Sequence, residues 1–149
     1  MKKILFVLLL FFSVGFSFLQ IASLQPTHFP APQYALPTLS DSSKIELGRL
    51  LFYDAALSRD SSISCSSCHS PYNAFAHTDH DLSHGIDNQI GLRNAPALFN
   101  LAWQSVFMWD GAIHHIEVQA AAPISHPKEM GSSIAEMVSR LSTSPFYRN

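Results

Sequence analysis

Apolar side chains recur at helical intervals in two stretches of the chain, one near residue 45 and the other near residue 135. The first stretch follows Ser43-x-x-Glu46, which is typical of a capping box at the start of a helix. Its apolar members are Ile45, Leu47, Leu50, Leu51 and Phe52. The second stretch follows Ser133-x-x-Glu136 and has the clearer period, at Ile134, Met137, Val138 and Leu141. Both stretches are therefore predicted to be helices.

Other segments carry weaker helix signals. Pro96 suits the first turn of a short helix that would run to about residue 102. A second short helix is predicted over 115–121, and Ser144-Pro145 is typical of the start of a further one. Residues 71–95 have no sustained period and are predicted to be loop. Because no segment alternates as a strand does, the fold class is predicted to be mainly α with long loops.

The N-terminal residues differ from the rest of the chain. Lys2 and Lys3 precede a run without charge, 4–19, which is the pattern of an export signal. Residues 1–23 are therefore predicted to be a signal peptide, with an uncleaved membrane anchor as the alternative. Residues 24–40 contain four prolines and no charge among 24–39, and are predicted to be a Pro-rich linker. Export predicts a periplasmic location, which is an oxidising compartment.

The charge of the exported part excludes one class of partner. Without Lys2 and Lys3, seven basic residues remain against eleven acidic ones, a net charge of −4. A mildly acidic chain has no electrostatic footprint for nucleic acid, so no nucleic-acid partner is expected.

The chain has two cysteines, Cys65 and Cys68, and His69 follows directly. A close cysteine pair serves a redox disulfide, half of a zinc site or covalent haem attachment. In an exported Cys-x-x-Cys-His, both thiols bond the haem vinyl groups and the histidine ligates the iron. Haem c, attached through Cys65 and Cys68 with His69 as the axial ligand, is the preferred interpretation.

The two other uses of the cysteine pair have weaker support. A zinc site needs about four ligands, and there is no second cysteine pair. The histidines that could complete such a site are His77, His80 and His84. A thioredoxin-like pair would lie beside a βαβ pattern, which is absent.

Four further segments carry a family resemblance: 47-LGRLLFYDAALSRDSSISCSSCH-69, 92-LRNAPALFN-100, 108-MWDGAIHHIEVQAAAPI-124 and 127-PKEMG-131. Together with their spacing they resemble the N-terminal haem domain of the bacterial di-haem cytochrome c peroxidases, a family that includes the methylamine-utilisation-type di-haem enzymes. The resemblance implies a cytochrome c-like haem domain over 41–149. Since no cysteine follows Cys68, the chain is expected to be C-terminally truncated, with the second haem domain absent.

The resemblance also implies roles for single residues. Glu129 corresponds to the distal acid–base glutamate, Gln119 to a glutamine of the same pocket, and Trp109 to the tryptophan that passes electrons between two haems. Asn94 corresponds to a ligand of a calcium ion between the two domains. Without the resemblance, Glu129 would be interpreted as a solvated loop carboxylate and Trp109 as a core side chain.

The sixth position of the iron has a candidate ligand in His84, with His77 and His80 as competitors. His114 and His115 are expected to be structural or exposed. Met108 and Met130 are expected to serve in packing.

The function implied by the resemblance is reduction of hydrogen peroxide to water, with electrons from a small cytochrome c or a cupredoxin. One haem is expected in this chain and two in the full-length protein. A homodimer is one expected oligomeric state of the full-length protein. The alternative is a single-haem electron-transfer cytochrome, in which a strong second axial ligand closes the iron to substrates. A third class, a non-haem metal or structural module, would carry no covalently bound haem.

Overall fold

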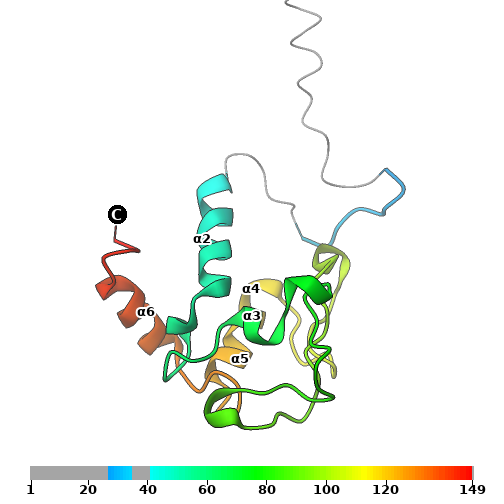
Figure 1. Cartoon of the computed structure of the whole chain (residues 1–149). Coiled ribbons are helices and arrows are strands. Elements are labelled where there is room, and N and C mark those ends of the chain that lie inside the picture. The colour runs from blue at the N-terminus through cyan, green and yellow to red at the C-terminus, as the bar shows by residue number, and fades with distance from the viewer. Residues whose placement is uncertain (1–26, 35–40, 149) are drawn as a thin grey trace, which may run out of the picture. The chain divides into compact units, whose positions relative to one another are not determined.

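The computed structural model describes residues 27–34 and 41–148 (Figure 1). The chain divides into two units, Met1–Pro30 and Ala31–Asn149, and every candidate site residue belongs to the second. The predicted signal peptide and most of the predicted linker lie outside the described residues. Within the described ranges, no helix combines the length and apolar character needed to cross a membrane.

The second unit is helical, and the described residues form no sheet. Its α-helices are α2 (Ser42–Tyr53), α3 (Cys65–Cys68), α4 (Ile116–Gln119), α5 (Ala121–Ser125) and α6 (Ile134–Thr143). Its 3-10 helices are η2 (Ala55–Leu57), η3 (Pro71–Asn73), η4 (Ile86–Asn88) and η5 (Leu101–Trp103). Isolated β-bridges close three loops, at Ser70–Ala76, His84–Ile90 and Phe107–Ile113. The predicted fold class, mainly α with long loops, is confirmed.

Helix α2 begins where the sequence predicts it, but it is not capped as predicted. Asp41 is the N-cap residue and makes no side-chain cap hydrogen bond. The Glu46 carboxylate instead accepts two hydrogen bonds from the Arg49 guanidinium, at 2.5 and 2.8 Å. The predicted capping box between Ser43 and Glu46 is therefore wrong, because Arg49, one helical turn away, occupies the Glu46 carboxylate.

Helix α6 has the predicted cap. The Ser133 hydroxyl accepts a hydrogen bond from the Glu136 amide at 3.2 Å and donates one to the Glu136 carboxylate at 3.0 Å. Met137 packs on the core, while Val138 is 55% exposed. The Arg140 guanidinium donates to the carbonyl groups of three residues, Ala56, Ser58 and Arg59, and so joins α6 to η2.

The structure does not confirm the weaker helix predictions as they stand. The segment predicted as one helix over 115–121 is split between α4 and α5, since Pro123 has no N–H to continue the helical hydrogen bonds. No helix begins at Pro96; Asn100 is left-handed, with φ of 57°, and only the short η5 follows it. Beyond Pro145, residues 145–147 form a turn, so the helix predicted there is also wrong.

The apolar core lies where η2, α5 and α6 meet (Figure 1). Its buried members are Leu57, Ile124 and Met130. Leu51, Ile63, Met137 and Leu141 pack around them. The packing role predicted for Met130 is confirmed, with 4% of its surface exposed. Helix α2, by contrast, has no buried residue.

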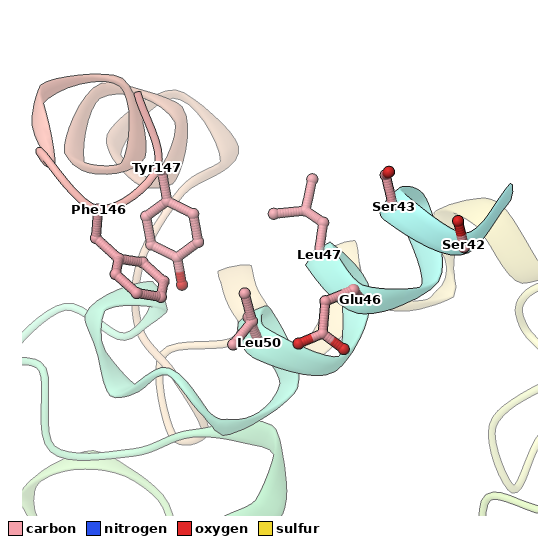
Figure 2. A pocket seen from close by; sticks show the side chains of 7 residues that line it. All are labelled: Ser42, Ser43, Glu46, Leu47, Leu50, Phe146 and Tyr147. Atoms are coloured by element: carbon pink, nitrogen blue, oxygen red, sulfur yellow. The ribbon is translucent and has the colours of Figure 1, made fainter. Parts of the chain in front are cut away.

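A groove of about 600 Å³ runs between α2 and the segment after α6. Figure 2 shows Phe146 and Tyr147 on one wall and Leu47 and Leu50 of α2 on the other. The polar members of the lining are Ser42, Ser43 and Glu46. None of the predicted site residues lines this groove, so it belongs to the scaffold and not to the site.

The contact between Tyr147 and Asp54 gives a test of this scaffold. The Tyr147 hydroxyl donates to Asp54 at 2.6 Å, and burial followed by the Asp54 carboxylate raises the pKa of Tyr147 from 10.0 to about 12. Because the folded-state pKa is the higher one, this stabilisation is complete below pH 10 and is lost as the pH rises toward 12. Tyr147→Phe should lower the free energy of unfolding by about 0.5–1 kcal/mol at pH 7.

Urea unfolding followed by circular dichroism at pH 7 and near pH 11.5 measures this difference. The gap between wild type and Tyr147→Phe should narrow at the higher pH. Tyr72→Phe is the matched control, because Tyr72 is 95% exposed and should leave stability unchanged. A gap that is absent at pH 7, or that stays constant with pH, would contradict the contact.

Candidate functional site

His69 is held in one tautomer by a backbone carbonyl. Its Nδ1 lies 2.8 Å from the carbonyl oxygen of Phe75. Because a carbonyl can only accept, Nδ1 carries the proton, and the lone pair of the neutral ring is on Nε2. A histidine that donates through Nδ1 and offers Nε2 is the usual form of a metal-ligating imidazole.

The Phe75 carbonyl reaches His69 through a tight turn. The Phe75 amide donates to the Ser70 carbonyl at 2.8 Å, and a β-bridge joins Ser70 to Ala76. Ala74 and Phe75 are both left-handed, with φ of 53° and 59°. That conformation costs about 1–2 kcal/mol per non-glycine residue, so the surrounding hydrogen bonds must stabilise it.

Cys65 and Cys68 begin and end the single turn of α3. Ser64 and Ser67 form a capping box that fixes the start of this helix. Burial raises the pKa of both thiols; for Cys68 the negative charge of Glu129 raises it further, and that of Cys65 adds a smaller effect. Two thiols one turn apart, followed by a histidine with Nε2 free, fit covalent haem attachment and axial ligation.

Residues 84–86 connect the cysteine motif to the turn that carries Glu129. The Cys68 thiol donates to the His84 carbonyl at 3.4 Å, and the Ile86 amide donates to the Glu129 carbonyl at 2.8 Å. Between them, Gly85 approaches so closely that an added Cβ would lie 2.0 Å from the Lys128 carbonyl oxygen. The structure therefore places Glu129 beside α3, although the two are distant in sequence.

The turn 126–131 is fixed from within as well. The amides of Glu129 and Gly131 both donate to the His126 carbonyl, at 3.0 and 2.9 Å. Gly131 has φ of 59°, and a Cβ there would lie 2.2 Å from Cδ1 of Ile86. Glycine is required at 131 for both reasons, and Ile86 is fully buried against the turn.

Trp109 and Asn94 are brought together by a hydrogen bond. The Trp109 indole N–H donates to the Asn94 carbonyl at 2.8 Å, and the Trp109 side chain is 65% exposed. The side-chain oxygen of Asn94 is buried and has no hydrogen-bond partner among the described residues. An unpartnered oxygen of this kind fits one ligand of a calcium ion, which takes six to eight oxygens.

Gln119 lies beside Met108. Its amide donates to the Met108 sulfur at 3.5 Å. Met108 is 39% exposed and left-handed, with φ of 67°, and the packing role expected for it stays a prediction. His114 and His115 are exposed, as predicted.

The three loop histidines lie in a row. His77 Nε2 is 3.2 Å from His80 Nδ1, and the rings of His80 and His84 are 4.5 Å apart. His84 Nδ1 lies 3.0 Å from the Asn88 side-chain oxygen, so the contact with Asn88 uses Nδ1 and does not involve Nε2. Across 27–34 and 41–148, no three His, Cys, Asp or Glu side chains are grouped as a metal site. His84 as the distal ligand stays a prediction.

These features define a helical domain with a c-type haem attachment motif. Residues 42–149 match the family described as di-haem cytochrome c peroxidase. The chain belongs to this family, whose members bind c-type haem, and the predicted resemblance is confirmed.

Two characterised relatives illustrate the match. The chain is 38% identical over 110 residues to the methylamine utilization protein MauG of Methylorubrum extorquens. This alignment covers 70% of this chain and 29% of the MauG chain. It is 37% identical over 150 residues to the cytochrome c551 peroxidase of Nitrosomonas europaea, which covers 99% of this chain and 43% of the relative.

A solved structure agrees with them. The crystal structure of a MauG-like protein associated with microbial copper homeostasis superposes with a TM-score of 0.72 at 33% identity. The match covers 86% of this chain and 38% of that one. The chain thus spans less than half the length of each of these relatives.

Three site residues were not identified from the sequence. Phe75 acts through its carbonyl, which every residue has, so no sequence signal exists for it. Gly85 follows His84 directly, and an isolated loop glycine indicates a close backbone approach without naming the partner. His126 is within the turn of Glu129, and its i, i+3 spacing from Glu129 was the available signal.

The close approach of Gly85 gives a stability test. Gly85→Ala places a methyl group against the backbone of Lys128 and Glu129, which cannot move aside as a flexible side chain can. We expect a loss of about 1–3 kcal/mol in the free energy of unfolding. Gly48→Ala is the control, since Gly48 is inside α2 with nothing within 4 Å, and it should stabilise by about 0.5–1 kcal/mol.

Chemical denaturation of the two variants beside wild type measures both effects. Equal stability of Gly85→Ala and wild type would show that residues 84–86 do not contact the turn as described. Opposite signs for the two glycine-to-alanine changes would confirm the contact, because both changes lower the entropy of the unfolded chain and only Gly85→Ala introduces a steric clash.

The thiols give a second test, on the haem-free chain. Because their pKa values lie above the ordinary 9.0, alkylation of Cys65 and Cys68 by iodoacetamide should be slow at pH 8 and rise only above pH 9. Glu129→Gln should lower the pKa of Cys68 and leave that of Cys65 unchanged. Mass spectrometry of each peptide against pH, with the urea-unfolded chain as reference, measures this. An unchanged profile for Cys68 would place Glu129 away from α3.

Proposed function

We propose that this chain is the peroxide-reacting haem part of a periplasmic peroxidase that reduces hydrogen peroxide to water. The reaction is H₂O₂ + 2 H⁺ + 2 e⁻ → 2 H₂O. The observation that supports it is the position of Glu129 beside the haem-attachment helix. Its charge raises the pKa of the Cys68 thiol, and its backbone is bonded to Ile86, two residues after the carbonyl that accepts from Cys68.

The attachment residues act first. Cys65 and Cys68 would hold haem c through thioether bonds, and His69 would ligate the iron through Nε2. The hydrogen bond from His69 Nδ1 to the Phe75 carbonyl orients the ring and leaves the lone pair on Nε2. Bound haem supplies an iron that binds peroxide and the redox chemistry that divides its O–O bond.

Glu129 moves the proton. Its carboxylate would take a proton from one peroxide oxygen and pass it to the other, which leaves as water. Gln119 supplies an amide to the same pocket, with its position set by the Met108 sulfur. His84 would be a further ligand of the iron, through Nε2, because its Nδ1 is the atom that contacts the Asn88 side-chain oxygen.

Electrons come from outside this part of the protein. Trp109 is proposed to pass them from a second haem, which receives them from a small cytochrome c or a cupredoxin. The exposed Trp109 indole and its hydrogen bond to the Asn94 carbonyl support a position at the junction of two domains. The unpartnered Asn94 side-chain oxygen supports a calcium ion at the same junction.

The decisive variant is Glu129→Gln in the haem-loaded chain. Without the acid–base group, the rate of the reaction with peroxide should fall by about 10²–10⁴-fold, while haem stays covalently bound. Stopped-flow absorbance after mixing with peroxide measures the rate, and the haem content of the denatured protein measures attachment. The control is Glu117→Gln, on the exposed face of α4, which should react as wild type does.

Two outcomes would contradict the proposal. An unchanged rate in Glu129→Gln would remove the acid–base role. A wild-type chain with six-coordinate, low-spin iron that ignores both peroxide and carbon monoxide in either oxidation state would be an electron-transfer cytochrome.

A further inference from the structure

The proposed reaction consumes two protons for each peroxide. Glu129 can carry a proton from one peroxide oxygen to the other, but this transfer adds none to the total. Both consumed protons must come from solvent, and a side chain in contact with Glu129 can collect them and deliver them to its carboxylate. The inference below rests on the proposed function and identifies this side chain.

His126 lies beside Glu129 in the same turn, and both side chains are partly exposed. Its Nδ1 lies 3.7 Å from Oε1 of Glu129, and its side chain is 44% exposed against 35% for Glu129. This separation is longer than a hydrogen bond and too short to hold a water between the two atoms, so a small rotation of either side chain brings them into direct hydrogen-bond contact. Both residues are in the turn 126–131, where the Glu129 amide donates to the His126 carbonyl. The contact is therefore built into the turn.

The groups around Nδ1 of His126 are compatible with both the neutral and the protonated ring. The Lys128 amide approaches Nδ1 at 3.3 Å, so the neutral ring accepts a hydrogen bond there. When Nδ1 is protonated it can only donate, and the Glu129 carboxylate is the acceptor on that side. The ring can therefore hold a proton toward Glu129 and remain hydrogen-bonded after giving it up.

We propose that His126 is the proton-relay residue that connects Glu129 to solvent. The imidazolium passes its Nδ1 proton directly to Oε1 of Glu129. The resulting neutral ring keeps its Nε2 proton and takes up another proton from bulk water at Nδ1. No electron moves, and each turnover uses the relay twice.

Other charged groups near the turn do not replace His126. Within residues 41–148 no other basic side chain lies within 4 Å of the Glu129 carboxylate. Arg59 and Asp87, which flank the turn from neighbouring segments, are paired with each other at 2.5 Å. Cys68 carries a thiol whose pKa burial raises, and His84 is bonded to Asn88. Histidine is also the side chain that exchanges protons readily near neutral pH.

The test is His126→Gln in the haem-loaded chain, with His114→Gln as the matched exposed control. The rate of the peroxide reaction should fall by about tenfold or more, with a deficit that grows as the pH rises and solvent protons become scarce. The solvent deuterium isotope effect should increase, and added imidazole should restore the rate. His114→Gln should match wild type in each respect.

A measurement without turnover tests the same contact. In the ferrous, carbon monoxide-bound chain, the ¹⁵N chemical shift of His126 Nδ1 should change on Glu129→Gln, while that of His114 should not. A shift that is unaffected by Glu129→Gln would overturn the relay even if His126→Gln proved too unstable to assay.

The kinetic outcomes separate this inference from the proposed function. Slow Glu129→Gln with wild-type behaviour of His126→Gln would overturn the relay and leave the peroxidase function standing. A slow His126→Gln that imidazole does not restore, with an unchanged isotope effect, would indicate a structural role and also overturn the relay. Full activity of Glu129→Gln would contradict the peroxidase function itself.

Discussion

The close contact of two backbones holds the site together. Residues 84–86 lie against Lys128 and Glu129 so tightly that a single methyl group at Gly85 would meet a carbonyl oxygen at 2.0 Å. The same segment accepts the Cys68 thiol at its His84 carbonyl. Without this contact, the cysteine motif and the Glu129 turn would be separate loops. Loop residues alone could not keep the Glu129 carboxylate beside the cysteine motif.

The parts of the site that the sequence predicted are those with local causes. Cys65, Cys68 and His69 need only one helical turn, and α3 is that turn. Helix α6 has both a clear apolar period and a serine cap, and the structure confirms both. The spacing of Glu129 from the other motifs came from the family resemblance, because nothing near Glu129 in sequence distinguishes it from a solvated loop carboxylate.

The parts that the sequence did not predict depend on choices between partners. The Glu46 carboxylate had two available partners, the backbone at the start of its own helix and the Arg49 guanidinium. In the structure it accepts from Arg49. The carbonyl that fixes His69 belongs to Phe75 because Ala74 and Phe75 are both left-handed. Neither residue type favours that conformation, so propensity predicts the opposite.

Two different kinds of interaction stabilise the two sides of the site, apolar packing beside Glu129 and hydrogen bonds around His69. Met130 is buried with Leu57 and Ile124 and directly follows Glu129, and its carbonyl accepts from the Arg59 amide at 2.9 Å. Apolar packing of Met130 therefore acts with the backbone contact of residues 84–86 to fix where Glu129 lies. His69 is instead fixed by hydrogen bonds in a strained turn, and α3 has no buried residue. A covalently attached haem would add the apolar surface that this side lacks, so loosening of the core should displace the Glu129 carboxylate before it displaces His69.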